Sequence, residues 1–219
     1  MIHPSELFKR ITMPKSNFFR HIGKHLSYKF HKVRKDKTIY VCFQGSNGMT
    51  DWLHNFLFKP RRMETYKGCG WFVHAGFARV WRSGSDTVMK ELRKLHERLP
   101  GFKIVFCGFS HGGPLAMLAA KKWHHITGQR CECVTFGSPK LAWGDAARRV
   151  LSNAMILTNW ANRADAITAL PFDIWGFLHV LLHLVNVRSI PILSLFRIHK
   201  HHLIYSRPEI YPENWRRAA

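Results

Sequence analysis

The stretch from residue 102 to residue 128 constrains the fold most strongly. "FKIVFCG" (102–108) is a short apolar run typical of a buried strand, and it leads directly into Gly-x-Ser-x-Gly, here "GFSHG" (108–112). A segment rich in small residues follows and stops at Gly128, as expected of a helix. So sharp a turn needs glycine, because side chains at the tight positions would clash. The pattern predicts a nucleophile elbow that lifts the hydroxyl of Ser110 above the end of a strand.

Further apolar runs alternate with helical patterns on both sides of this turn. We expect strands at 38–45, 102–108, 131–137 and 155–160, a short strand or turn at 71–77, and helices at 77–99, 111–127 and 145–151. Apolar strands separated by helices are typical of an α/β fold with a mostly parallel central sheet flanked by helices. The length of 219 residues, 46% of them hydrophobic, suits one folded domain, which we assign to residues 38–219.

Residues 1–37 form a basic segment ahead of this domain. Their apolar side chains recur every three to four residues, which predicts one stripe on an amphipathic helix. The stripe consists of Phe18, Phe19, Ile22, Leu26, Phe30 and Val33. We expect such a helix either to pack on the domain or to lie on an anionic lipid surface. A transit peptide is a third alternative, disfavoured because those peptides prefer Arg and Ser, whereas this segment prefers Lys.

The charge balance of the chain is strongly basic. Its 34 Lys and Arg outnumber 13 Asp and Glu, for a formal net charge of +21, which favours anionic membranes, nucleic acid or acidic substrates as partners. No apolar signal region follows Met1, and the five cysteines show no metal-binding spacing. These features predict an intracellular protein, cytoplasmic or peripheral on a membrane. The longest apolar stretch, 174–187, is too short for a transmembrane helix.

The scarcity of carboxylates narrows the choice of an acidic partner for Ser110. After an elbow of this type the acid and then a histidine are expected in chain order. Asp165 stands in a loop just after the strand at 155–160, at the carboxyl end of the sheet, where α/β active sites form. Asp173 is the second choice, and Asp145 is expected to cap a helix.

Histidine candidates are more numerous. His111 directly follows the serine, so its side chain should point away from the hydroxyl, toward a substrate pocket or solvent. Its backbone N–H is the group expected to serve the site, as an oxyanion donor. The base should then come from His179 and His183 or from "HKHH" (199–202), and chain order favours the second cluster.

Several blocks resemble the class 3 lipase family, the fungal-type triacylglycerol lipases with the α/β-hydrolase fold. In chain order they are "VCFQGS" (41–46), "DWLHNF" (51–56), "VHAGF" (73–77), "GFSHGG" (108–113), "VTFGSPK" (134–140), "NRADAITALP" (162–171) and "HHLIY" (201–205). Together they cover the chain from about residue 38 to residue 206. The chain departs from the family pattern at Phe109, usually His, and at His111, usually Leu.

The resemblance implies a serine ester hydrolase of the lipase or phospholipase A type, with no metal or organic cofactor. The family's triad falls on Ser110, Asp165 and His202, with the adjacent His201 left as an alternative base. Its oxyanion hole falls on Ser46 and on the backbone of His111.

The segment after Ser46 resembles the family's lid. Its apolar side chains share one helical face and are followed by cations, so they are expected to cover a pocket and open toward lipid. These side chains are Trp52, Leu53, Phe56 and Leu57.

Two other functions remain open from sequence. One is a catalytically inactive hydrolase-fold protein that binds anionic membranes or nucleic acid, which the charge of +21 favours. The complete candidate set of catalytic residues argues against it, and nucleic acid is not the expected partner. The other is a serine peptidase or thioesterase, which would use the same triad.

Overall fold

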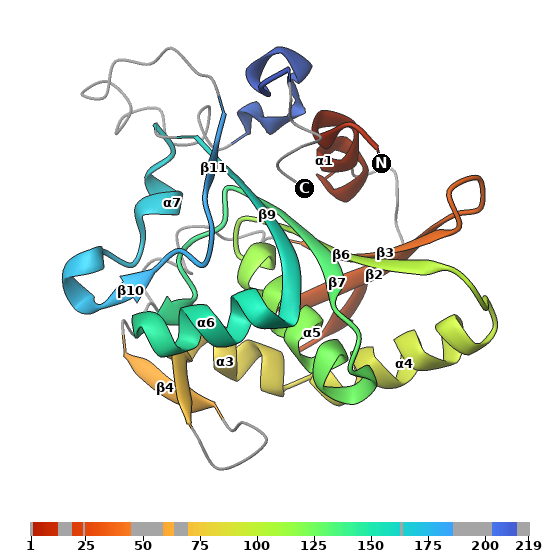
Figure 1. Ribbon diagram of the computed structural model, residues 1–219, viewed down its shortest axis with the longest axis horizontal. Helices are drawn as coiled ribbons and strands as arrows, with labels where there is room; N and C mark the ends of the chain where they lie inside the picture. The colour runs from red at the N-terminus through yellow and green to blue at the C-terminus, as the bar shows by residue number, and fades with distance from the viewer. Residues whose placement is uncertain are drawn as a thin grey trace.

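A central sheet organises the protein, which is described here from a computed structural model (Figure 1). The structure describes residues 2–12, 19–23, 25–44, 59–63, 70–162, 164–185 and 203–213. Within them the sheet has seven strands in the order β1-β2-β3-β6-β7-β9-β11. Their bounds are β1 (Arg20–Ile22), β2 (Leu26–Val33), β3 (Thr38–Phe43), β6 (Lys103–Phe109), β7 (Cys131–Phe136), β9 (Met155–Ala161) and β11 (His183–Leu184).

The five strands β3, β6, β7, β9 and β11 pair in parallel with one another, whereas β2 pairs antiparallel with both β1 and β3. Neighbouring register places Cys42 beside Cys107 and Phe106 beside Cys133. The expected α/β class with a mostly parallel sheet is therefore confirmed. Because the carboxyl ends of parallel strands share one edge, the loops after β6, β7 and β9 converge there.

Helices cover both faces of this sheet. One face carries α3 (Ala75–Arg82), α4 (Ser85–Glu97), α5 (Gly112–Thr127) and α6 (Gly144–Ala154), which share one apolar core with the strands. The other face carries α1 (Pro4–Thr12) and the 3-10 turns η3 (Ile204–Ser206) and η4 (Pro208–Ile210). Successive side chains of β3 point to opposite faces of the sheet, so Val41 belongs to the core under α3 to α6 and Cys42 to the core under α1.

A second, antiparallel sheet lies at one end of the molecule, with the order β10-β8-β5-β4. Its strands are β4 (Pro60–Met63), β5 (Trp71–His74), β8 (Ala142–Trp143) and β10 (Phe177–Leu178). Of these four strands, only β5 was expected. Strands β8 and β10 are two residues long, and two residues show no alternation that a sequence could reveal. The short helix α7 (Ala166–Ala169) and the turn η1 (Asp173–Trp175) connect β9 to this sheet.

The helix expected over residues 18–33 is wrong. The described residues there form the hairpin β1–β2, whose turn includes Gly23 at a φ of +60°. Leu26, Tyr28 and Phe30 lie two residues apart, so they satisfy the period of a strand as well as the spacing of a helix. Strand β2 pairs along its length with β3, so residues 26–33 belong to the central sheet.

The helix expected over 77–99 is divided into α3 and α4 at Ser83 and Gly84. A Cβ at Gly84 would overlap Leu26 Cδ2 and would lie 2.7 Å from Ile22 Cδ1. The glycine thus lets the β1–β2 hairpin approach the break closely. The helices expected at 111–127 and 145–151 are confirmed as α5 and α6.

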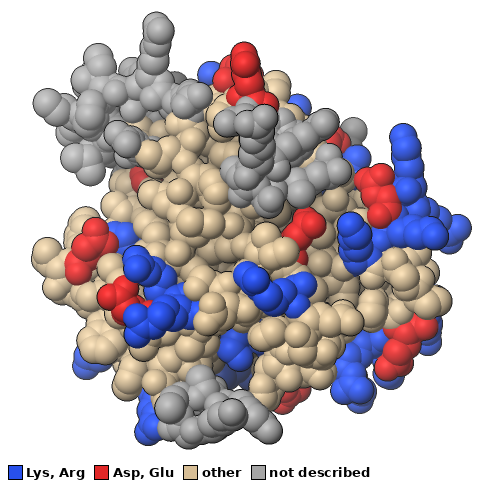
Figure 2. All heavy atoms as spheres, viewed as in Figure 1, with Lys and Arg blue, Asp and Glu red and all other residues tan. Residues whose placement is uncertain are grey.

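The basic side chains are spread over the face of the molecule shown in Figure 2, where Lys and Arg lie over several elements with Asp and Glu between them. Within the described ranges, moreover, no helix is both long and apolar enough to cross a bilayer.

Candidate active site

Ser110 occupies a strained turn between β6 and α5. Its φ is +53°, a left-handed conformation that a residue with a Cβ rarely adopts. Two backbone hydrogen bonds fix the turn: the Ser110 N–H donates to the Phe136 carbonyl at 2.9 Å, and the Ser110 carbonyl accepts from the Gly113 N–H at 2.9 Å. Strain of this kind is typical of functional sites, and its position after a buried strand is that of a nucleophile elbow.

Three glycines make the turn sterically feasible. A Cβ on Gly108 would overlap the Gly112 carbonyl, and one on Gly112 would overlap the Phe43 carbonyl. A Cβ on Gly113 would come within 2.5 Å of Ser138 Oγ. The spacing of the motif is therefore explained by backbone packing, and the close approach at Gly112 places the end of β3 against the elbow.

His111 begins α5 with its side chain in the core. It is 2% exposed, and its ring lies 5.4 Å from that of Phe77, centroid to centroid. Burial lowers the pKa of His111 to about 3, with smaller contributions from His25 and His74. The ring is thus neutral near pH 7, and the expectation that it could face solvent is wrong. The residue sits in a core position, where apolar side chains are common.

Asp165 lies four residues after β9 and is 1% exposed. Its Oδ1 accepts from the Ile167 N–H at 3.1 Å and thereby caps α7. Its Oδ2 accepts from the Tyr205 hydroxyl at 3.2 Å, while that hydroxyl accepts from the Asn162 N–H at 2.9 Å. Both carboxylate oxygens are therefore held in place by the protein.

Tyr205 connects this carboxylate to the elbow. It is fully buried, and its ring lies 6.5 Å from that of Phe109, the residue before Ser110, and 5.7 Å from that of Phe8 in α1. Burial, and next the charge of Asp165, raises the pKa of Tyr205 well above its ordinary value. In the sequence, Tyr205 was noted only as the last residue of "HHLIY", and no contact was predicted for it. The signal that could have pointed to it is the presence of an aromatic residue three positions after the candidate base.

The other acidic candidates occupy peripheral positions. Asp173 is exposed and forms a 2.7 Å ion pair with Lys140. Asp145 pairs with Arg148 at 3.1 Å in the first turn of α6, whose N-cap is Trp143, so the expected capping role of Asp145 is corrected.

The first histidine cluster has structural partners. His179 Nε2 lies 2.8 Å from the Thr168 carbonyl, and His183 Nδ1 accepts from the Asn159 N–H at 3.2 Å. Burial lowers the pKa of His179. These contacts join the segment after β10 to β9 and α7.

The remaining site predictions lie outside the described residues: Ser46, the lid side chains Trp52, Leu53, Phe56 and Leu57, and the candidate bases His201 and His202.

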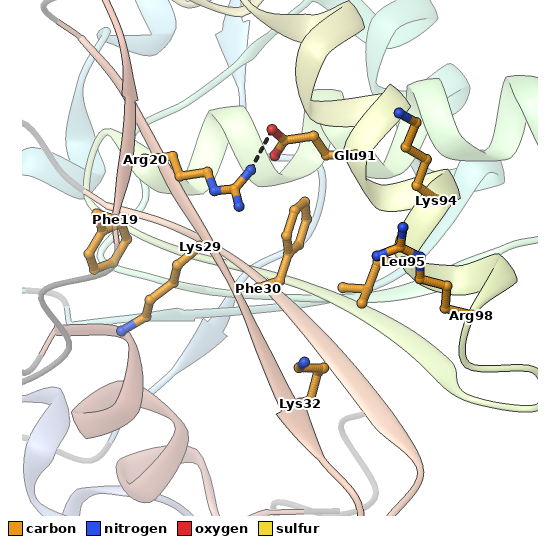
Figure 3. Close-up of a pocket in the computed structure, with 9 residues that line it drawn as sticks. All are labelled: Phe19, Arg20, Lys29, Phe30, Lys32, Glu91, Lys94, Leu95 and Arg98. Atoms are coloured by element: carbon orange, nitrogen blue, oxygen red, sulfur yellow. Dashed lines mark hydrogen bonds and ion pairs between the residues drawn. The ribbon is translucent and has the colours of Figure 1, made fainter.

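A basic groove of about 620 Å³ lies elsewhere, between the β1–β2 hairpin and α4 (Figure 3). Arg20 points toward Glu91 and pairs with it at 2.5 Å, whereas Lys29 points the opposite way and donates to the Arg10 carbonyl at 2.8 Å. The cations do not converge on one point, and the lining contains neither Ser110 nor Asp165. This groove is therefore separate from the candidate active site.

Residues 40–175 match the model of the lipase (class 3) family. The chain belongs to the class 3 lipase family. It is 26% identical over 148 residues to a lipase of Rhizomucor miehei, covering 66% of this chain and 40% of that protein. It is 28% identical over 143 residues to a secreted mono- and diacylglycerol lipase of Fusarium solani, covering 65% and 42%. The chain thus spans less than half the length of these relatives.

Solved class 3 lipases share the fold. Lipase II of Rhizopus niveus matches with a TM-score of 0.69 at 19% identity, over 80% of this chain and 74% of that one. The triacylglyceride lipase of Rhizomucor miehei matches with a TM-score of 0.67 at 20% identity, over 80% and 73%. The expected α/β-hydrolase fold is thereby confirmed.

The relatives contradict the expected location. Those of Fusarium solani and Penicillium cyclopium are secreted lipases, so the prediction of an intracellular protein is wrong. That prediction depended on the missing apolar signal region after Met1 and on the cysteine pattern. Cys42, Cys107 and Cys133 are buried core residues of β3, β6 and β7. A buried thiol packs as a small apolar group, so it says little about the redox state of a compartment.

The buried ring of His111 should make stability depend on pH. Because its folded pKa, about 3, lies below the ordinary 6.5, its contribution is complete above pH 6.5 and is lost as pH falls toward 3. At pH 5 this loss is about 2 kcal/mol. His111→Leu should remove that part of the slope, measured by urea unfolding at pH 7.5 and pH 5. His125→Leu, on the exposed end of α5, should retain the parent slope; equal slopes in all three proteins would contradict the assignment.

Proposed function

We propose that this class 3 lipase is a serine hydrolase of lipid carboxylic esters, and that Ser110, Asp165 and His202 form its catalytic triad. The observation that carries the proposal is the hydrogen bond from Tyr205 to Asp165. Tyr205 follows His202 by three residues and contacts the residue before Ser110. Only three peptide units, at most about 11 Å of chain, separate the candidate base from the residue that holds the carboxylate.

The reaction begins with proton transfer from Ser110 Oγ to the imidazole of His202. The oxygen attacks the ester carbonyl carbon, and the imidazolium is stabilised by the Asp165 carboxylate. Collapse of the tetrahedral intermediate releases the alcohol, which takes the proton from His202, and leaves an acyl-serine. Water then attacks the acyl-serine with His202 again as base, releasing the fatty acid and restoring Ser110.

The oxyanion is stabilised by backbone N–H groups. His111 supplies one from the first position after the nucleophile, at the N-terminus of α5, where the helix dipole also favours negative charge. Ser46 supplies the second, two residues beyond Gln44. Support for this pairing comes from the contact between Gly112 and the end of β3, which brings the two segments together.

The substrate is a lipid ester, in line with the lipases and mono- and diacylglycerol lipases that the chain resembles. Trp52, Leu53, Phe56 and Leu57 are proposed to form a lid over the acyl pocket. The net charge of +21 favours anionic lipid surfaces, because each cation near such a surface contributes about 1 kcal/mol.

Ser110→Ala should abolish ester hydrolysis, because it removes the nucleophile. We expect a loss of at least about a thousandfold in kcat with p-nitrophenyl esters and emulsified triacylglycerol, with an unchanged circular dichroism spectrum. Ser152→Ala, on the exposed side of α6, is the matched control and should keep full activity. A fluorophosphonate probe should label the parent and not the Ser110 variant. A folded parent that neither labels nor hydrolyses any ester would instead indicate an inactive lipid-binding hydrolase shell.

The identity of the base can be tested among three histidines. His202→Ala should lower kcat by at least about a thousandfold, whereas His201→Ala and His111→Leu should each cost less than about tenfold. The measurement is kcat on a soluble ester at pH 8. Loss of activity in the His111 variant, with the His202 variant active, would reverse the proposed assignment.

Tyr205→Phe should reduce kcat by about tenfold, because losing a hydrogen bond to a charged group costs about 1.5 kcal/mol of positioning. Tyr28→Phe is the matched control, since Tyr28 also donates to a carboxylate, that of Glu91 at 2.8 Å. Both variants should lose free energy of unfolding in urea, the Tyr205 variant more, because it also leaves the buried Asn162 N–H without this acceptor. Only the Tyr205 variant should lose kcat, and an equal effect on kcat in both would argue for a purely structural role.

A further inference from the structure

A group of apolar side chains is exposed around the turn η1. Residues 172–175 are all exposed, and Ile174 is 85% exposed, the highest value among the large apolar side chains that the structure describes. We define the η1 surface as Phe72, Trp143, Phe172, Ile174 and Trp175. A soluble protein rarely presents such a contiguous apolar patch unless the patch meets a partner.

The η1 surface is held rigidly in this exposed position. The rings of Phe172 and Trp175 lie 5.4 Å apart, and those of Phe72 and Trp143 lie 5.5 Å apart. Trp143 Nε1 donates to the Trp175 carbonyl at 2.9 Å, which joins the two pairs. These contacts attach the turn to the second sheet and leave Ile174 exposed.

The same turn is tied to the candidate active site. Lys140 Nζ donates to the carbonyl of Ala169, the last residue of α7, and forms an ion pair with Asp173 in η1. Asp165 caps the other end of α7. In Figure 1 the turn between α7 and β10 projects from the left edge of the molecule.

A cation continues the surface along the second sheet. Arg62 in β4 pairs in register with Phe72 in β5, and Phe72 pairs with Trp143 in β8. Directly opposite residues of an antiparallel sheet share one face, so Arg62, Phe72 and Trp143 form one row. Arg62 is exposed, whereas the adjacent Arg61 pairs with Val73 and so belongs to the opposite face of the sheet. Aromatic and aliphatic side chains flanked by a cation match the layer where acyl chains meet anionic head groups.

We propose that the η1 surface docks the protein on an anionic lipid–water interface, with Ile174 and Phe172 entering the head-group layer and Arg62 meeting the head groups. The proposal rests on the proposed lipid ester hydrolase function. It adds a fixed docking surface, distinct from the lid, that presents the carboxyl edge of the sheet to the lipid.

Vesicle binding tests the surface separately from catalysis. In the Ser110→Ala background, Ile174→Ser should weaken partition onto phosphatidylcholine vesicles containing phosphatidylglycerol by about tenfold, or about 1.4 kcal/mol. Ile174→Leu, which keeps an apolar side chain, should bind the vesicles as strongly as the parent. The matched control is Ile126→Ser, since Ile126 is also exposed, at 38%, but lies at the far end of α5. Thermal unfolding verifies that each variant is folded.

Replacing the cation should act only through charge. Arg62→Gln should weaken partition onto the anionic vesicles by about fivefold at low salt, with little effect on pure phosphatidylcholine, whereas Arg61→Gln, on the opposite face of β4, should have a much smaller effect. Salt at 0.5 M should reduce this difference, while the Ile174 effect persists.

Two outcomes would overturn the proposal. One is equal vesicle partition by the Ile174→Ser and Ile126→Ser proteins. The other is an unchanged partition combined with a shift from dimer to monomer in Ile174→Ser, measured by light scattering, which would make the surface a contact between two copies of the chain. Neither outcome depends on Ser110, so a failure of the proposed catalysis, read from fluorophosphonate labelling, remains distinguishable.

Discussion

The hydrogen bond from Tyr205 to Asp165 joins parts of the chain that are otherwise far apart. One hydroxyl donates to the carboxylate and accepts from the Asn162 N–H, so the loop after β9 and the turn η3 are fixed against each other. The tyrosine ring rests on Phe109 and Phe8, so the same residue also supports the elbow and receives α1. A buried hydroxyl so placed has little freedom, because leaving either partner unsatisfied would cost about 1–3 kcal/mol. The acid loop, the elbow and the C-terminal segment therefore form one unit.

The elbow depends on a different constraint, the close packing of backbone against backbone. Ser110 takes a left-handed conformation that is unfavourable for a residue with a Cβ, and three glycines provide the space for it. The free-energy cost of such a conformation, on the order of 1 kcal/mol, is offset by hydrogen bonds to Phe136 and Gly113 and by burial of α5. The unfavourable free energy arises at Ser110 alone, whereas the favourable contacts are spread over several elements. The glycines around Ser110 are therefore required, while Phe109 and His111 can depart from the family pattern.

Much of the fold was predictable because its strands are buried on both faces. Strands β3, β6, β7 and β9 are nearly continuous apolar runs, which is the clearest signal a parallel sheet gives. The hairpin β1–β2 was misjudged because spacings of two and four residues both fit its apolar positions, and only pairing with β3 decides between them. Strands β8 and β10 were missed because two residues carry no periodicity.

For the site, chain order and motif identified Ser110 and Asp165, but the role of Tyr205 needed the contact between segments forty residues apart.

The buried histidines His74 and His111 show why a histidine next to the nucleophile in sequence need not be its base. Burial lowers the pKa of His74 to about 4 and that of His111 to about 3, and both rings pack against Phe77. A base must gain and lose a proton near neutral pH, which requires a pKa close to 7. His111 cannot meet that requirement where it lies, although it directly follows the nucleophile. A histidine that meets it needs a carboxylate beside it to stabilise the charged ring, which is the role that the proposed mechanism gives to Asp165, already oriented by Tyr205.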